Sequence, residues 1–395
     1  MTQTSYIFNQ LVQWLPRDKF DRLVKQYKGN AYVKDFSCWK HLLVMIWAQL
    51  TSRRSLRDIE TSLRAHSDKL YRMGMGRNIS RNNIANANAR RDVAIYRGLA
   101  QEMMRLAASA KIRDKHLGRI ASEFSLNGFF AIDSSTVSLD LAGHPWCKPQ
   151  KGGFGGVKLH TMYDIMREVP RMCLVTGREE RDQTFMEDYP YEPGCFYVLD
   201  KAYVKTLGMA AIQKAKGFFV VRRKRNMVYS VVGGGTSTGG PVMADMTIRF
   251  TSRWASQGYP WNLRMVTFYV EDKNETMQFM TNNFDIPPTT VAILYKYRWQ
   301  IELFFKWMKQ HMRIVSFYGT SANAVMIQIY TAFTTYCLLA LVAGAIGYKG
   351  GLYDFSNLVS VSLTEKIGIK ELVARFEKRE MNNDGKDGTW PSLFD

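Results

Sequence analysis

Four polar residues in the last third of the chain have types and spacing that suit the handling of a phosphate group. They lie in the segment VAILYKYRWQIELFFKWMKQH and are Tyr295, Arg298, Glu302 and Lys309. At about 100° per residue, their offsets of zero, three, seven and fourteen place all four on one face of a predicted helix. Tyr295 can hydrogen-bond a phosphate, and Arg298 and Lys309 can neutralise it. The alternative is an ordinary amphipathic helix with an Arg298–Glu302 pair four residues apart.

Two further acids stand at the ends of apolar segments that are predicted to be strands. Asp133 follows GFFAI, and Asp200 follows CFYVL. Together with Glu302 they supply three carboxylates, which are hard oxygen ligands for divalent metal ions. In two-metal phosphoryl transfer, one ion activates a water or hydroxyl and the other stabilises the leaving oxygen. A single Asp at a strand end more often caps a turn, so the prediction depends on the three acids together.

Basic and imidazole side chains lie close to these acids in the sequence. The run from Arg222 to Arg225, which includes Lys224, leaves an apolar segment and could track a DNA backbone if that strand end lies near Asp200. A solvated run of charges is the alternative. His160 alternates with Lys158 on one predicted strand face and could approach the acids, but a structural histidine is the favoured interpretation.

These residues need strands and helices to bring them together. From Asn127 onward, short apolar segments with period-two alternation predict a mixed α/β core. Asp200 and Glu302 are 102 positions apart, and the strand-rich sequence between them predicts an inserted β subdomain. The predicted division is a helical DNA-binding region at 1–125, the α/β core at 126–222 and 285–347, the β insertion at 223–284, and a C-terminal helical region with a tail at 348–395.

The apolar stretch at 325–347, VMIQIYTAFTTYCLLALVAGAIG, is long enough to suggest a membrane span. Gln328 and several threonines interrupt it, and it closely follows the charged helix described above. We therefore predict a helix that is buried in protein on nearly all sides.

The N-terminal region is dominated by helical periodicity and by positive charge. Two helical stretches around a Gly-containing turn resemble a helix-turn-helix arrangement, and Ser80 is the predicted N-cap of the second. The side chains suited to groove and phosphate contacts on that second stretch are Arg81, Asn82, Asn83, Asn86, Arg90 and Arg91. A solvated basic face on a helical bundle explains the same pattern equally well.

The charge of the whole chain restricts its partners. The 395 residues carry 54 Lys and Arg against 35 Asp and Glu, and the resulting +19 predicts nucleic acid or an anionic membrane surface as partner. Residues 1–125 hold +13 of this excess, which favours a DNA-gripping module there. Five scattered cysteines without a C-x-x-C pair argue against a zinc ribbon and a secreted disulfide framework. With no signal peptide visible, we expect a reducing cytoplasm.

The chain resembles the bacterial cut-and-paste transposases of the insertion-sequence-four group. The group's signature Y-x2-R-x3-E-x6-K is met by Tyr295, Arg298, Glu302 and Lys309. Supporting blocks are IDSSTVSL, VKLHTMYD, VLDKAYV and FFVVRRKRN, so the resemblance covers about residues 127–312. The N-terminal helices resemble the group's DNA-binding region more weakly.

The resemblance implies an RNase H-like catalytic core whose DDE triad is Asp133, Asp200 and Glu302. These acids would hold two Mg²⁺ ions, for which Mn²⁺ could substitute. Water would attack the phosphodiester at a transposon end, and the freed 3′ hydroxyl would be the next nucleophile. The implied partners are DNA, as terminal inverted repeats and target, and a second copy of the chain on paired ends, with no membrane. The implied location is the bacterial cytoplasm, in association with the nucleoid.

One residue departs from the pattern of the group. Lys201 stands just after the second acid, where some relatives have arginine, which puts one phosphate contact in doubt. In parts of the group a tryptophan of the β insertion receives a flipped base, and Trp254 and Trp261 are candidates by location. Core packing is the favoured role for each.

Two other classes of function are compatible with these residues. A catalytically silent, transposase-derived DNA-binding protein would keep the fold, although the intact Asp133, Asp200 and Glu302 argue against it. A structure-selective nuclease would share the acids but would not need ordered recognition of the transposon ends.

Overall fold

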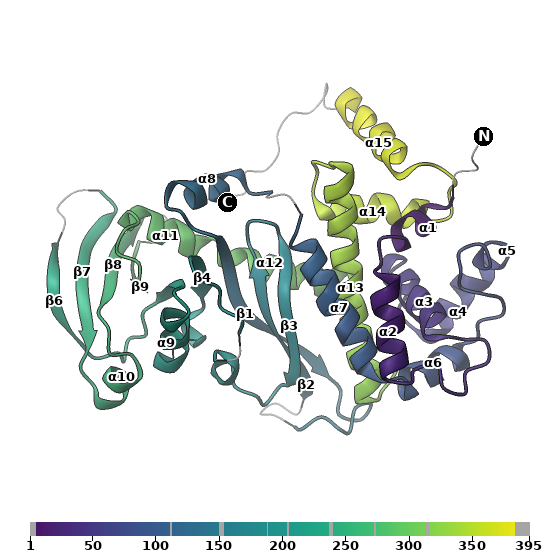
Figure 1. Cartoon of the computed structure of the whole chain (residues 1–395), viewed down its shortest axis with the longest axis horizontal. Coiled ribbons are helices and arrows are strands. Elements are labelled where there is room, and N and C mark those ends of the chain that lie inside the picture. Colours follow the sequence, from purple (N-terminus) through teal and green to yellow (C-terminus); the bar gives the residue numbers. More distant parts are fainter. Residues whose placement is uncertain are drawn as a thin grey trace. The chain divides into compact units, whose positions relative to one another are not determined.

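The computed structural model describes residues 5–110, 113–149, 154–187, 189–203, 205–236, 240–271, 274–312, 314 and 316–383. Within them the chain is a mixed α/β protein with helices at both ends and one large sheet (Figure 1). It divides into two compact units. We call Met1–Ala110 with His311–Asp395 the helical unit, and Lys111–Gln310 the sheet unit.

The helical unit is built around two helices that are buried along almost their whole length, α3 and α13. Several of its helices begin at a residue whose side chain caps the first turn. Ser80, for example, forms a capping box with Asn83 and so satisfies backbone amides of the first turn of α6. The helices are α1 (Ile7–Val12), α2 (Arg17–Gln26), α3 (Cys38–Leu50), α4 (Leu56–Ala65), α5 (Ser67–Leu70), α6 (Arg81–Arg90), α7 (Val93–Ala107), α13 (Ala322–Ile346), α14 (Leu352–Ser362) and α15 (Ile369–Asn383).

Helix α13 is long and apolar enough to cross a membrane, but 78% of its most apolar window is buried inside the protein, as a core helix would be. Its polar groups are satisfied there. Gln328 accepts a hydrogen bond from the Tyr318 amide and donates one to the Ser316 carbonyl. Gly347 ends the helix with a φ of +78°, a left-handed conformation that glycine adopts without strain. The predicted buried helix is therefore found.

The sheet unit carries a nine-stranded sheet in the order β3-β2-β1-β4-β5-β9-β8-β7-β6 (Figure 1). Strands β1, β4 and β5 run parallel, and the other neighbouring pairs are antiparallel. The strands are β1 (Gly128–Leu139), β2 (Gly155–Asp164), β3 (Val169–Gly177), β4 (Cys195–Leu199), β5 (Phe218–Arg222), β6 (Tyr229–Thr236), β7 (Val242–Phe250), β8 (Leu263–Val270) and β9 (Glu275–Thr281). The helices are α8 (Lys115–Glu123), α9 (Thr206–Lys214), α10 (Arg253–Gly258), α11 (Pro288–Lys296), α12 (Trp299–His311) and the short 3₁₀ helices η1 (Asp182–Phe185) and η2 (Lys201–Tyr203).

The predicted boundaries of the β insertion and of the core differ from this arrangement. The inserted strands exist, but β9 pairs with β5, so they extend the central sheet and do not form a separate sheet. One hydrophobic cluster runs from Phe219 and Val221 into Ile248 and Met265, which leaves no boundary in the core. Residues 311–347 belong to the helical unit because α13, apolar on all sides, packs against α3 and α7.

The pleat of β1 assigns its residues to two faces. Ala131 lies opposite Tyr163 of β2, and the Tyr163 ring lies 4.9 Å from that of Phe304 in α12, so this face of β1 is turned toward α12. Phe130 and Ile132 face the other way, into the hydrophobic cluster with β4, β5 and α9. Because side chains alternate, the residue after Ile132 points toward α12 again. That residue is Asp133.

Candidate functional site

The first two predicted acids lie side by side where the parallel pairing of β1 with β4 ends. Asp200 follows the end of β4 as predicted, but Asp133 is not at a strand end, because β1 continues to Leu139 in its pairing with β2. The pairing of β1 with β4 ends at Ile132 opposite Leu199, and the next residues are Asp133 and Asp200. Asp133 Oδ1 accepts a hydrogen bond of 2.7 Å from the Ser134 amide, and Asp200 Oδ1 accepts one of 2.8 Å from the Ala202 amide. The apolar strands therefore bring the two carboxylates to one edge of the sheet unit.

The helix that carries the third acid is not continuous, and this part of the sequence prediction is wrong. Helix α11 ends at Lys296 and α12 begins at Trp299, with a tight turn between them in which the Arg298 amide donates to the Tyr295 carbonyl at 3.1 Å. Two aromatic residues on either side of the turn between α11 and α12 pack against different elements. Tyr295 packs on Phe279 of β9, whereas Tyr297 stacks on His116 of α8.

Arg298, in that turn, links all three acids. Its Nη1 atom lies 2.6 Å from Glu302 Oε1, 3.4 Å from Asp133 Oδ2 and 3.9 Å from Asp200 Oδ2. Burial lowers the pKa of Arg298, but the hydrogen bond with Glu302 and the surrounding negative charge outweigh it, so the pKa is raised overall. The predicted Arg298–Glu302 pair is present, and the same guanidinium also neutralises the two strand-end acids.

Even with this arginine nearby, the pKa of the Asp133 carboxyl is raised. Burial is the main cause that raises the pKa of Asp133 to about 7, and repulsion from Asp200 and Glu302 adds to it. The Ser134 amide and the Arg298 charge act in the opposite direction. Near neutral pH the cluster therefore holds part of a proton on Asp133, and a cation of higher charge would displace that proton.

The donor set fits a divalent cation, although the acids are not arranged around a shared ligand position. Among the described residues, no three His, Cys, Asp or Glu side chains are grouped so that they could hold one ion. The three carboxylates converge on Arg298 Nη1, which stands in for a cation. Carboxylate oxygens are the ligands that Mg²⁺ and Mn²⁺ prefer. Binding of such an ion by all three acids requires the guanidinium to move aside.

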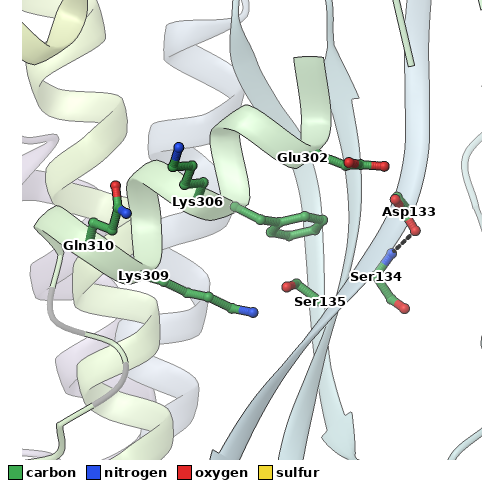
Figure 2. A pocket seen from close by; sticks show the side chains of 8 residues that line it. Asp133, Ser134, Ser135, Glu302, Lys306, Lys309 and Gln310 are labelled. Carbon is green, nitrogen blue, oxygen red and sulfur yellow. Dashed lines mark hydrogen bonds between the residues drawn. The ribbon is translucent and has the colours of Figure 1, made fainter. Parts of the chain in front are cut away.

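A cavity of about 500 Å³ opens beside Asp133 and Glu302, and Asp200 is not among the residues that line it (Figure 2). In Figure 2, Glu302 and Asp133 point toward one another, and the amino group of Lys309 is directed toward Ser135. Burial lowers the pKa of Lys309. The residues that line the cavity are Asp133, Ser134, Ser135, Glu302, Phe305, Lys306, Lys309 and Gln310. Carboxylates at one end and lysines along the helix are the groups that a phosphodiester beside a metal ion would require.

Lys306, Gln310 and Ser135 were not singled out from the sequence. A signal for two of them was present, since Lys306 and Gln310 follow Glu302 at i+4 and i+8 and so share its helical face. Ser135 lies two residues beyond Asp133 on the same strand, and period-two alternation places both on one face.

The basic run Arg222–Arg225 leaves β5 next to Asp200, as its predicted role requires. The pairing of β4 with β5 runs to Leu199 opposite Val221, so Asp200 and Arg222 follow on adjacent strands. Arg222 forms a salt bridge with Glu275. Burial lowers the pKa of Lys224, and the charge of Asp200 acts in the opposite direction.

His160 is a structural residue, as favoured from the sequence. It is fully buried, and its Nε2 atom lies 2.9 Å from Thr176 Oγ1. Burial lowers its pKa to about 4, so the ring is neutral at physiological pH. It lies directly opposite Ser134, on the face of the sheet that does not carry Asp133.

The N-terminal residues predicted to contact DNA fall into two groups. Arg81, Asn82 and Arg90 are exposed on α6. Arg91 is buried, donates to the Phe36 carbonyl and stacks over the Phe36 ring, so this structure does not offer it to DNA. The predicted second helical stretch divides at Arg91 because Asp92 caps a new helix, α7.

The two tryptophans of the insertion differ in exposure. Trp254 on α10 is 82% exposed, so the core-packing prediction is wrong for it. Trp261 is 38% exposed and its ring lies 5.2 Å from that of Tyr259, an edge-to-face contact at the margin of the core. Trp254 is therefore the tryptophan that can stack on an external partner.

Comparison with known proteins connects this geometry to a family. Residues 125–338 match the family model described as a transposase DDE domain, and residues 3–76 match a domain of unknown function. A protein of Sinorhizobium fredii described as transposase y4zB is 34% identical over 289 residues, which cover 72% of this chain and 77% of that protein.

Two further relatives are described as transposases of insertion sequence elements. One, for element IS5377 of Geobacillus stearothermophilus, is 28% identical over 67% of this chain and 66% of its own length. The other, for element IS4SA of Synechocystis, is 24% identical over 90% of this chain and 99% of its own length. The match to the transposase DDE domain spans more than half of the chain and includes all three acids. The chain belongs to the family of DDE transposases, the metal-dependent enzymes that cleave DNA and transfer its strands in transposition.

Proposed function

We propose that Asp133, Asp200 and Glu302 are the catalytic triad of this transposase and hold two Mg²⁺ ions, for which Mn²⁺ substitutes. The observation that carries this proposal is the convergence of the three carboxylates on the single Arg298 Nη1 atom. When bound, the ions activate a water or 3′ hydroxyl and stabilise the leaving oxygen of a phosphodiester. The proposed reaction is cleavage at the transposon ends followed by strand transfer into target DNA.

The chain's own residues perform the steps that surround this chemistry. Asp133 would hold a cation in its ionised form, and its pKa of about 7, which reflects burial and neighbouring negative charge, makes that form accessible near neutral pH. Arg298, released from the carboxylates, pairs with a non-bridging phosphate oxygen through its planar guanidinium. Lys309 neutralises the same strand from the wall of the cavity, and the Tyr295 hydroxyl interacts with Arg298.

The fold that we propose for the core is RNase H-like. Its support is the strand order β3-β2-β1-β4-β5, with three antiparallel strands followed by two that run parallel to β1. The strands β6 to β9 form the β-rich insertion before the helix that carries Glu302. We assign the N-terminal helices to DNA binding, with Arg81, Asn82 and Arg90 of α6 as contacts.

The remaining parts of the proposal concern assembly and location. Two copies of the chain would act on paired transposon ends, each bound to a terminal inverted repeat, in the bacterial cytoplasm in association with the nucleoid. The net charge of +19 supports binding to a polyanion. The burial of α13 inside the helical unit supports a protein that does not use this helix to enter a membrane.

The test is cleavage of labelled linear DNA that carries the element's terminal repeat with flanking sequence, in the presence of Mg²⁺. The native protein is compared with Glu302→Gln and with Glu371→Gln as a matched control. Glu371 pairs with Arg375 at i,i+4 and 2.6 Å, as Glu302 does with Arg298, but both side chains of the control pair are exposed. We expect cleavage at the repeat boundary by the native protein and the control only.

Two results would contradict the proposal. Tight binding to the repeat without cleavage by the native protein would identify a catalytically silent DNA-binding protein. Cleavage of branched or flapped DNA regardless of the repeat would identify a structure-selective nuclease on the same fold.

A further inference from the structure

Strand β1 loses a neighbour at the position of its acid. Its pairing with β4 ends at Ile132, whereas its pairing with β2 continues to Leu139. From Asp133 onward, the β4 side of the strand has no ladder of backbone hydrogen bonds with β4. A carboxylate that must meet an ion with sub-ångström tolerance needs another support at this point.

That support comes from Asp182, in the 3₁₀ helix η1. Its Oδ1 atom accepts a hydrogen bond of 2.6 Å from Ser134 Oγ. The same oxygen lies 3.2 Å from Lys158 Nζ, which also donates to the Glu180 carbonyl at 2.7 Å. A short hydrogen bond to an ionised acceptor is among the stronger polar contacts in proteins.

Ser134 connects Asp133 and Asp182, because it donates a hydrogen bond to each. Its amide N–H donates to Asp133 Oδ1, and its hydroxyl donates to Asp182 Oδ1. In Figure 2 the hydroxyl of Ser134 points away from the carboxylates of Asp133 and Glu302. Displacement of the Ser134 side chain would therefore shift the amide that orients the Asp133 carboxylate.

Asp182 lies on the other face of the sheet from Asp133. Ser134 is directly opposite His160, and the alternation of β2 places Lys158 and His160 on that same face. The ring of Phe185, also in η1, packs 4.6 Å from the His160 ring and holds η1 against this face. Asp182 is thus outside the cavity that Asp133, Glu302 and Lys309 line.

The charge of Asp182 is compensated locally. Its side chain is 25% exposed and that of Lys158 13% exposed, so the pair is largely shielded from water. His160 Nδ1 lies 3.7 Å from Asp182 Oδ1, too far for a hydrogen bond, and the ring is neutral. The oxygen of Asp182 that accepts from Ser134 therefore has the Lys158 amino group beside it.

We propose that Asp182 is a positioning residue of the site, which acts through Ser134 to hold the Asp133 carboxylate in the orientation that binds a divalent ion. The inference rests on the proposed function, because it takes Asp133 to be a metal ligand. Asp182 itself touches neither the ion nor the DNA. Its loss weakens metal binding without removing a ligand.

The experiment measures Mn²⁺ binding directly on the full chain without DNA, from the electron paramagnetic resonance signal of free Mn²⁺. The variants are Asp182→Ala, Ser134→Ala and their combination, with Asp182→Asn, which keeps an oxygen acceptor for Ser134. Glu187→Gln is the matched control, since Glu187 accepts from Lys205 at 3.1 Å in the same segment but outside the cluster. Thermal unfolding of each variant is recorded in parallel.

We expect Asp182→Ala and Ser134→Ala each to weaken Mn²⁺ binding about tenfold, because each removes the same hydrogen bond to a charged acceptor. The double variant should be no weaker than either single variant, since the two residues act through one bond. Asp182→Asn should retain most of the affinity, and Glu187→Gln all of it.

Unchanged Mn²⁺ binding in Asp182→Ala, whatever its thermal stability, would overturn the positioning role, and so would additive losses in the double variant. If Asp182→Ala does not fold, the pair Ser134→Ala and Asp182→Asn decides the question in the same way. If neither the native protein nor Glu302→Gln binds Mn²⁺, the metal assignment of the proposed function is contradicted. This inference, which depends on that assignment, is then contradicted as well.

Discussion

Replacement of Arg298 by glutamine should destabilise the protein in a way that a divalent ion repairs. Glutamine keeps a polar side chain in the turn between α11 and α12 but removes the positive charge. Arg298 is 15% exposed, and its Nη1 atom lies within 4 Å of three carboxylates. In the variant these carboxylates repel one another without a compensating charge.

The size of the effect follows from this geometry. Removal of one partner from a buried ion pair costs about 3–5 kcal/mol, because the remaining charge is left uncompensated. Asp133 relieves part of this cost by remaining protonated, since its pKa is already about 7. We therefore expect a loss near the lower limit, about 3 kcal/mol, which lowers the Tm of a unit of this size by about 6–12 °C.

The assay is thermal unfolding of native protein and Arg298→Gln with and without Mn²⁺, in the absence of DNA. The control is Arg264→Gln, because Arg264 is 8% exposed and lies 2.6 Å from Asp245 in the inserted strands. Mn²⁺ should raise the Tm of Arg298→Gln more than that of the native protein, since the ion meets free carboxylates and need not displace a guanidinium. At a hundred times its dissociation constant, an ion stabilises by about 2.7 kcal/mol, nearly the whole loss.

Arg264→Gln should lose stability and gain nothing extra from Mn²⁺. A rise in the Tm of Arg298→Gln that is equal to or smaller than that of the native protein would refute the reasoning, since it would mean that Arg298 does not occupy the place of the cation.

Three further predictions concern pH, salt and base stacking. Because the folded state raises the pKa of Asp133 from 3.8 to about 7, the metal-free protein should lose up to about 4 kcal/mol of stability as pH rises from 4 to 7; unfolding of Asp133→Asn should lack this component, and an unchanged pH profile in that variant would contradict it. Arg81→Ala and Arg90→Ala should each weaken binding to any DNA sequence and reduce the slope of log K against log salt by about one, measured by fluorescence anisotropy; unchanged slopes would place the DNA elsewhere. Trp254→Ala should leave thermal unfolding unchanged, since Trp254 is 82% exposed, and weaken binding to DNA ends with an unpaired base by about 1–3 kcal/mol; equal affinity for such ends would exclude stacking.

The acids could be predicted from the sequence because each prediction rested on local rules. Asp133 and Asp200 each follow a short apolar run, and the parallel pairing of β1 with β4 ends at those runs, so the two acids lie side by side. The continuation of β1 beyond Asp133 could not be predicted in this way, because it depends on the pairing with β2. Ser80 could be recognised as an N-cap for a similar reason, since capping depends on the first helical turn alone.

The features that could not be predicted depend on contacts between distant segments. The break before α12 lies in the sequence YKYRW, which contains neither glycine nor proline, and packing of Tyr295 and Tyr297 on different elements accompanies it. The burial of Arg91 depends on the carbonyl of Phe36, 55 residues earlier. Asp182 lies 48 residues from its partner Ser134, so no local pattern connects them.

Because β9 pairs with β5, the length of the inserted segment does not affect the positions of Asp200 and Glu302 relative to one another. After β5 the chain forms the outermost strand, β6, and then returns through β7 and β8 to β9, which pairs with β5. Most of the 102 positions between Asp200 and Glu302 therefore belong to strands that begin and end next to β5. Strands can be added or removed at the outer edge of the sheet while β9 remains paired with β5. A change in the number of outer strands would alter the outer edge of the sheet and leave the separation of Asp200 and Glu302 in space unchanged.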